Sequence, residues 1–395
     1  MIRDRIHCVI FIAAAWIMIG SAMVAPATCL AWDEVVNEQL KTLDMSGLES
    51  FLQNVDQSMK DYFPELSLTE ILHAPGAGNK ISISVSSLVG GVLRILAREV
   101  VANLHLLGQL IVLAVLCTLL MTFSSGFEAQ TVTSLAHGMA FVVLAIMGLN
   151  SFGMATSLAM ATIENMTSLM YVLMPVLFTA LAALGGVATV AAVNPIIVMV
   201  TGGVGTLIKN IVFPLVLLSI TVDVAGRVFE RIQIGRLAGL LRDAAVMSLG
   251  FALCIFLGII SIRGVGASVT DGVSIRAAKF VSNTFVPVVG KMFSDAVGVV
   301  AGCSLLIQSA VSIAGLLGVV MVCLHPLMKL LAVIIMYKVA GALTQPLGDE
   351  RLSGALNSLG NGLILIFVTV ASVALMFFVC IAVVAALGNV TAALR

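Results

Sequence analysis

The sequence LSGALNSLGNGLILIFVTVASVALMFFVCIAVVAALGNVTAAL, residues 352–394, contains no Asp, Glu, Lys or Arg. A helix needs about 20 apolar residues to cross the hydrocarbon core of a bilayer, so this stretch is long enough for a crossing. Backbone amides in lipid must pair within their own segment, which leaves only helices and closed barrels. A barrel strand alternates apolar and polar residues, whereas this run is continuously apolar. We therefore expect a transmembrane helix.

Five other stretches lack charged residues in the same way: 100–127, 129–163, 165–208, 244–262 and 296–328. Of the 395 residues, 60% are apolar and 10% are charged. A soluble domain is about 45–50% apolar and roughly 25% charged, so these charged side chains are too few to cover a soluble surface of this size. The composition predicts an all-α, polytopic membrane protein whose outer surface faces mostly lipid.

We expect about seven or eight transmembrane helices, within a multi-pass domain at residues 104–395. The candidate crossings are 104–123, 135–158, 167–187, 196–222, 245–262, 297–324, 327–344 and 363–387. The crossing at 196–222 is irregular, because Gly202, Gly203, Gly205, Lys209 and Pro214 interrupt it. Such breaks occur at membrane depth only where protein or a water-filled cavity satisfies the freed backbone groups.

Residues 1–27 have the layout of a cleavable secretory signal. Arg3 and Arg5 precede the apolar run 8–23, and Ala25 and Ala27 are small residues at the two positions that a signal peptidase inspects. An uncleaved signal anchor is the alternative, because the run is long enough to span a bilayer. In both cases we expect the following segment to lie outside the cytoplasm.

Residues 28–80 have an ordinary soluble composition. Nine acids and three lysines within 32–80 give a net charge of −6. Apolar residues recur at three- and four-residue steps, as on amphipathic helices, and the Pro-Gly-Ala-Gly sequence at 75–78 predicts a linker. Fewer than fifty residues bury little core, so we predict a small, acidic, extracytoplasmic helical domain that packs on the membrane domain or on a partner. Residues 81–103 then predict an amphipathic helix, either along the bilayer surface or continuous with the first crossing.

The orientation in the membrane stays open. Lys and Arg normally concentrate in cytoplasmic loops, yet the segments 224–243 and 263–295 are equally basic. If residues 245–262 cross the membrane, these two segments face opposite sides.

Lys209 is the candidate intramembrane charge. It lies inside the glycine-rich crossing, and a cation within the membrane is costly enough to indicate a function. The alternative is that Lys209 lies near a helix end and extends its ammonium group to the lipid headgroups. From its depth we predict that replacing it with alanine impairs function and leaves the amount of protein in the membrane unchanged.

A second candidate is the segment 271–295, in which charged and apolar residues alternate around a central proline. The residues that mark it are Asp271, Arg276, Lys279, Pro287, Lys291 and Asp295. A pair of helices on the lipid surface explains this pattern, and so does a gate or a loop that docks a partner protein.

The inventory of reactive side chains predicts no enzyme, no cofactor and no metal site. The five histidines are isolated and offer no pair of ligands at helical spacing. No serine has a positioned base, and no phosphate- or dinucleotide-binding glycine pattern is present. No basic cluster is dense enough for nucleic acid. The seven cysteines form no C-x-x-C pair and are expected to act as small apolar residues.

The segment around residue 280 resembles the stage III sporulation protein AE family. The resemblance is carried by DGV (271–273), Arg276, AKF (278–280), VPVVGK (286–291) and SDA (294–296). It extends over the glycine-rich crossings, the signal and the acidic domain, essentially the whole chain.

The resemblance implies a subunit, in the mother-cell membrane around the forespore, of a multi-protein, secretion-like channel that endospore formation requires. The implied partners are other membrane and extracytoplasmic subunits of that complex, together with the lipid bilayer, and no catalytic residue is implied. A self-contained transporter and a non-conducting membrane scaffold are the alternatives.

Overall fold

The computed structural model describes residues 45–60, 62–63, 67–73, 85–125, 130–228, 235–285, 287–347 and 350–393. The predicted signal at 1–27 lies outside them, as do residues 28–44 and 74–80 of the acidic segment. Every regular element of the described residues is a helix. The all-α prediction is therefore confirmed.

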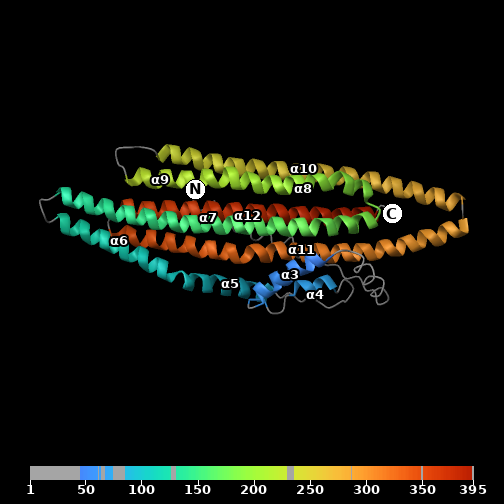
Figure 1. The fold of residues 1–395 in the computed structure, drawn as a ribbon, viewed down its shortest axis with the longest axis horizontal. Helices are drawn as coiled ribbons and strands as arrows, with labels where there is room; N and C mark the ends of the chain where they lie inside the picture. The colour runs from blue at the N-terminus through green and yellow to red at the C-terminus, as the bar shows by residue number, and fades with distance from the viewer. Residues whose placement is uncertain are drawn as a thin grey trace.

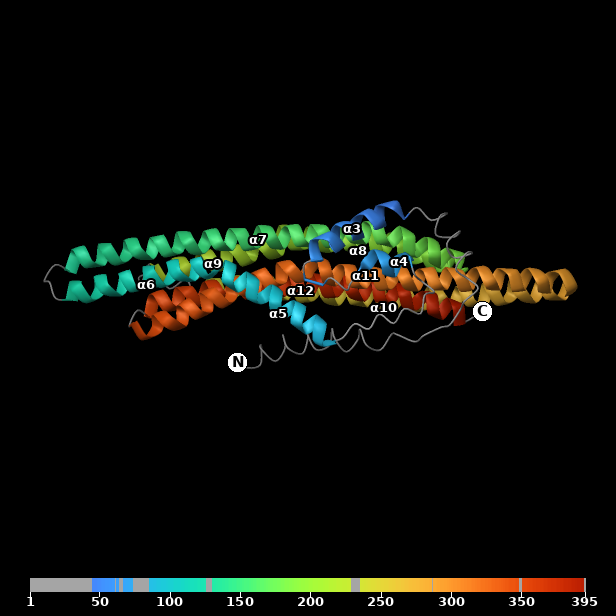
Figure 2. The same ribbon diagram turned by 90° about the horizontal axis from the view of Figure 1, so that it is seen from below.

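The helices form an elongated bundle (Figures 1 and 2). Two short helices come first, α3 (Ser46–Met59) and α4 (Leu68–His73), followed by α5 (Val85–Ala102) and α6 (Leu104–Ser125). The chain continues as α7 (Gln130–Ala183), α8 (Val187–Leu207), a π-helical turn η1 (Ile208–Val212) and α9 (Phe213–Val228). It ends with α10 (Gly235–Phe285), α11 (Pro287–Thr344), a 3-10 turn η2 (Gln345–Leu347) and α12 (Glu350–Ala393).

Glycines allow the long helices to pack closely. A Cβ added at Gly148 of α7 would lie 2.4 Å from Leu359 of α12, and one at Gly315 of α11 would lie 2.5 Å from Leu173 of α7. Small residues that bring helix backbones together are typical of membrane bundles, because lipid supplies no hydrophobic force between helices. The closeness of these contacts explains why glycine occupies both positions.

Five helices of the described residues are long and apolar enough to cross a membrane, or six if α5 and α6, bent by 44°, form one span. The predicted count of seven or eight is not confirmed. Two predicted boundaries are wrong, because α7 runs without a turn through Glu164, and α11 runs through Pro326. The sequence prediction treated the charge or proline at each place as a turn, whereas a packed helix tolerates both.

The long helices extend well beyond what a bilayer needs. At 1.5 Å per residue, the 58 residues of α11 reach about 87 Å, against a hydrocarbon core of roughly 30 Å. Parts of these helices therefore lie outside the hydrocarbon core.

The turn between α7 and α8 is tight and depends on two glycines. Gly185 has a φ of 86°, in the left-handed region that glycine adopts without steric cost. Its N–H donates to the carbonyl of Ala182, and the N–H of Gly186 donates to the carbonyl of Leu181. This pattern caps the end of α7 and sends α8 back along it.

The described part of the acidic segment packs along the side of the bundle. Leu48 and Leu52 of α3 are fully buried, and Leu52 lies against Gly318 of α11. Asp56 accepts hydrogen bonds from the backbone N–H groups of Leu68 (2.9 Å) and Thr69 (3.1 Å), which caps the start of α4. The two short helices thus form one unit that shares the core of α7 and α11.

The two basic segments lie at opposite ends of α10. One surrounds the connection from α9 to α10, and the other contains the end of α10 and the start of α11. Residues 271–295 are therefore not an extended loop, because helix runs through Phe285 and resumes at Pro287. This hairpin tip projects past the ends of the neighbouring helices (Figures 1 and 2).

Candidate functional site

Lys209 lies in the π-helical turn η1, between α8 and α9. The proline five residues further on explains this turn. Pro214 has no N–H to donate, and its ring crowds the carbonyl four residues before it, so a regular α-helix is strained there. The π-helical turn is one residue wider than an α-helical turn and accommodates the proline. Such turns are frequent at functional sites. The predicted break in this crossing is thus present at 208–212, whereas the glycines at 202, 203 and 205 lie in regular helix.

Glu164 of α7 pairs with Lys209. The Lys209 Nζ lies 3.1 Å from the Glu164 Oε1, and the side chains are 60% and 64% exposed respectively. The sequence analysis singled out Lys209 and missed its partner. The tight turn at 185–186 offered a signal, because Glu164 precedes Gly185 by 21 residues and Lys209 follows it by 24. An antiparallel helix pair places such residues near one another.

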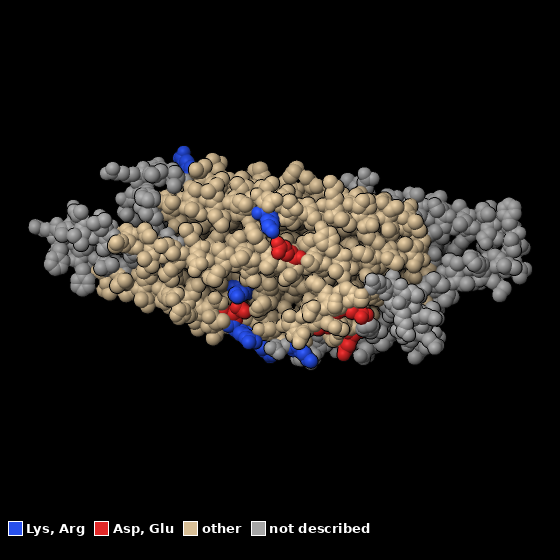
Figure 3. Space-filling view, in the orientation of Figure 1, with Lys and Arg blue, Asp and Glu red and all other residues tan. Residues whose placement is uncertain are grey.

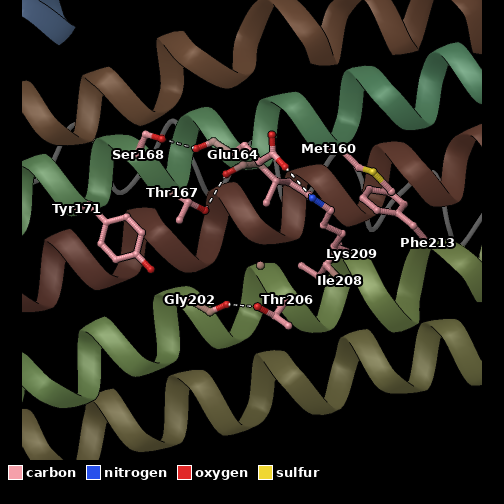
Figure 4. Close-up of a pocket in the computed structure, with 12 residues that line it drawn as sticks. Met160, Glu164, Thr167, Ser168, Tyr171, Gly202, Thr206, Ile208, Lys209 and Phe213 are labelled. Atoms are coloured by element: carbon pink, nitrogen blue, oxygen red, sulfur yellow. Dashed lines mark hydrogen bonds and ion pairs between the residues drawn. The ribbon is translucent and has the colours of Figure 1, made fainter.

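The pair spans a groove between α7 and α8 with a volume of about 510 Å³. Figure 4 shows Glu164, Ser168 and Tyr171 along α7, facing Thr206 and Lys209 across the groove. Ile163 and Ile208 are buried below them. The groove is therefore apolar underneath, with polar side chains on both walls.

The hydroxyl groups of the groove donate to their own helices. Ser168 Oγ donates to the Glu164 carbonyl (2.9 Å), Thr167 Oγ1 to the Ile163 carbonyl (2.8 Å) and Thr206 Oγ1 to the Gly202 carbonyl (2.9 Å). A hydroxyl oxygen also carries two lone pairs that accept hydrogen bonds. These walls can therefore accept hydrogen bonds from a ligand or from water.

A second polar cluster lies between α11 and α12. Lys338 Nζ donates to the Oδ1 atoms of Asn357 (2.5 Å) and Asn361 (2.6 Å). Gly360 lies between the two asparagines, and a Cβ there would be 3.1 Å from the Lys338 Cε. The glycine therefore lets the lysine chain lie against α12. We interpret this cluster as a link between the two helices, because it half-buries the lysine and uses neutral partners.

A third polar contact joins α5 to α11 and to residue 62. His325 Nδ1 lies 3.8 Å from the Glu99 Oε1. Arg98 donates to the Tyr62 hydroxyl (3.1 Å), with its guanidinium 5.6 Å from the centre of the tyrosine ring. These contacts hold the bent α5–α6 pair against the bundle.

The two predicted candidate sites are not brought together. Lys209 lies in η1, between α8 and α9, whereas the 271–295 tip lies at one end of the bundle (Figure 1). The structure describes the backbone but not the side chains of five of the residues that mark this segment: Asp271, Arg276, Lys279, Lys291 and Asp295. Among the side chains that the structure describes, no group of three or more His, Cys, Asp or Glu could hold a metal ion.

The sequence profile of the stage III sporulation protein AE family matches residues 66–388. The chain belongs to this family. The stage III sporulation protein AE of Bacillus subtilis (strain 168) is 39% identical over 296 residues, which cover 75% of this chain and 74% of that protein. No solved structure matches the chain. The resemblance inferred from residues 271–296 is thus confirmed, and membership in this family supports a role in sporulation.

Proposed function

We propose that this chain is a membrane subunit of a multi-protein channel between mother cell and forespore, required for endospore formation. The observation that carries the proposal is membership in the stage III sporulation protein AE family over residues 66–388. Five or six helices of the described residues, long and apolar enough to cross a membrane, support it. In this proposal the protein lies in the mother-cell membrane around the forespore and acts without catalysis.

Two surfaces are suited to holding partners in such a complex. The tip of the α10–α11 hairpin projects past the neighbouring helices (Figure 2), and the acidic segment at 32–80 has a net charge of −6 from nine acids and three lysines. A helical tip that projects past its neighbours is accessible to other proteins. We propose that other membrane and extracytoplasmic subunits bind at these two places.

A self-contained transporter is the second candidate, favoured by the broken crossing at η1 and by the groove beside it. Discontinuous helices next to a polar site are typical of secondary transporters. Purified protein in liposomes discriminates between the two functions. A transporter moves a solute by itself, whereas a channel subunit does not.

The main test uses a sporulating host in which this chain is the single copy. We expect deletion of the gene to abolish heat-resistant spores. We also expect the wild-type chain to co-purify with other membrane proteins, and removal of residues 271–295, bridged by a short glycine-serine turn, to abolish both co-purification and spores. Normal sporulation without the gene overturns the proposal. If no other membrane protein co-purifies and the purified chain transports a solute in liposomes, the transporter is supported instead.

A further inference from the structure

The outward face of α7 exposes no large aliphatic side chain over a length close to the thickness of a bilayer. Its exposed positions from 157 to 179 carry Ser157, Ala161, Glu164, Asn165, Ser168, Tyr171, Pro175 and Thr179. None of these is a large aliphatic residue. At 1.5 Å per residue the 22 steps cover about 33 Å, close to the roughly 30 Å of a hydrocarbon core.

The neighbouring helices expose a different kind of residue. On α8, Val198 and Met199 are 47% and 79% exposed. Met199 follows Gly185 by 14 residues and Tyr171 precedes it by 14, so the two lie at the same level of the antiparallel pair. On α10, Met247 and Phe251 are likewise exposed. α8 also exposes polar side chains such as Asn194 and Thr206, but α7 exposes no large aliphatic side chain between 157 and 179.

The ion pair makes lipid an unsuitable neighbour for this face. Glu164 lies 18 residues after the start and 19 before the end of the candidate span Ile146–Ala183. Two charges that face hydrocarbon lose their hydration, and their mutual attraction repays this only when other polar groups surround them. In Figure 3 a pair of opposite charges lies within a broad uncharged surface, and the other charges of this face lie below it. Both groups therefore need water or other polar groups on that side.

We propose that the groove between α7 and α8 is one wall of a water-filled path through the membrane, lined by Glu164 and Lys209. This inference deepens the proposed channel function and rests on it. The groove is open on the side away from the two helices, so other subunits or further copies of this chain complete the path. Because one carboxylate faces one ammonium group, this wall carries no net charge. The path therefore suits small hydrophilic solutes of either sign.

The test measures which thiols meet water in membranes prepared from sporulating cells. Ser168→Cys on α7 replaces a hydroxyl by a thiol of similar size, and Met199→Cys on α8 is the matched control. The probe is a quaternary-ammonium methanethiosulfonate, whose permanent charge keeps it out of lipid. The unmodified chain, whose native cysteines include Cys29 of the predicted extracytoplasmic domain and the exposed Cys254 of α10, supplies the background rate that is subtracted from both variants.

We expect the Ser168→Cys thiol to react at least about tenfold faster than the Met199→Cys thiol, because only the thiolate in water is the nucleophile. Equal and fast rates overturn the inference, because residues 168 and 199 then both lie outside the membrane. Equal and slow rates also overturn it, because lipid or protein then covers the groove. Heat-resistant spores are counted for the same variants. If both variants sporulate normally but their thiols react at equal rates, the water-filled path is excluded and the proposed function stands.

Discussion

The outward faces of α7 and α10 differ, although both helices are long and apolar. Of the most apolar window of each span, 56% is buried inside the bundle for α7 and 28% for α10. The exposed part of α10 between 244 and 255 consists of apolar and small residues, whereas that of α7 between 157 and 179 contains an ion pair and hydroxyl groups. Average apolarity thus identifies a membrane helix, but the exposed residues indicate what surrounds it.

The largest expected effect is charge reversal on α7. Glu164→Lys places an ammonium group where Lys209 has a carboxylate partner, and two like charges at this short distance repel each other. We expect heat-resistant spores to fall by about a hundredfold or more. The double variant Glu164→Lys with Lys209→Glu restores the pair and most of the spores. If the double variant is as defective as the single one, the pair itself is not what α7 requires.

A new charge on each face compares the two surroundings directly. A charge at the bilayer centre costs about 2.5–3.5 kcal/mol on insertion scales. We therefore expect Phe251→Lys on α10 to reduce the amount of chain in the membrane by about tenfold. Ser168→Lys on α7 leaves the amount near the wild-type level. Quantitative immunoblots of carbonate-washed membranes measure both, and equal losses contradict the difference between the faces.

Removing the lysine tests function separately from membrane insertion. Lys209→Ala leaves Glu164 without its partner and gives this wall of the groove a net negative charge. We expect spore counts to fall by about tenfold while the amount of protein in the membrane stays unchanged. Lys329→Ala, at another exposed lysine, is the control. Normal spore counts for Lys209→Ala remove this residue from consideration.

The smallest effect concerns helix packing. A Cβ at Gly148 of α7 would lie 2.4 Å from Leu359, whereas nothing lies within 4 Å of a Cβ at Gly250 of α10. Overpacking costs about 1–3 kcal/mol, so Gly148→Ala lowers the midpoint of thermal unfolding in detergent. Gly250→Ala leaves it unchanged or raises it slightly, because alanine favours helix over glycine. A fall for Gly250→Ala shows that another helix covers this part of α10.

Much of the architecture could be predicted from charge-free intervals. These intervals locate the membrane helices, and the family resemblance at 271–296 follows from short motifs. The glycine turn at 185–186 lies inside the predicted crossing 167–187 and was not predicted. The continuity of α7 through Glu164 and of α11 through Pro326 could not be predicted. A charge or a proline within an apolar run fits a turn and a packed helix equally well, and only neighbouring helices decide which is formed. The same ambiguity concealed Glu164 as the partner of Lys209.

By itself, the sequence determined that most of the outer surface faces lipid, because the chain has too many apolar and too few charged residues for a surface in water. It also determined where the backbone must be helical, since amides in hydrocarbon pair within their own segment. The tertiary structure decided which side of each helix faces outward. That choice depends on how glycines such as Gly148 and Gly315 let helices approach, and so on contacts between residues far apart in the chain. A polar face on one helix and an apolar face on the next result from this packing.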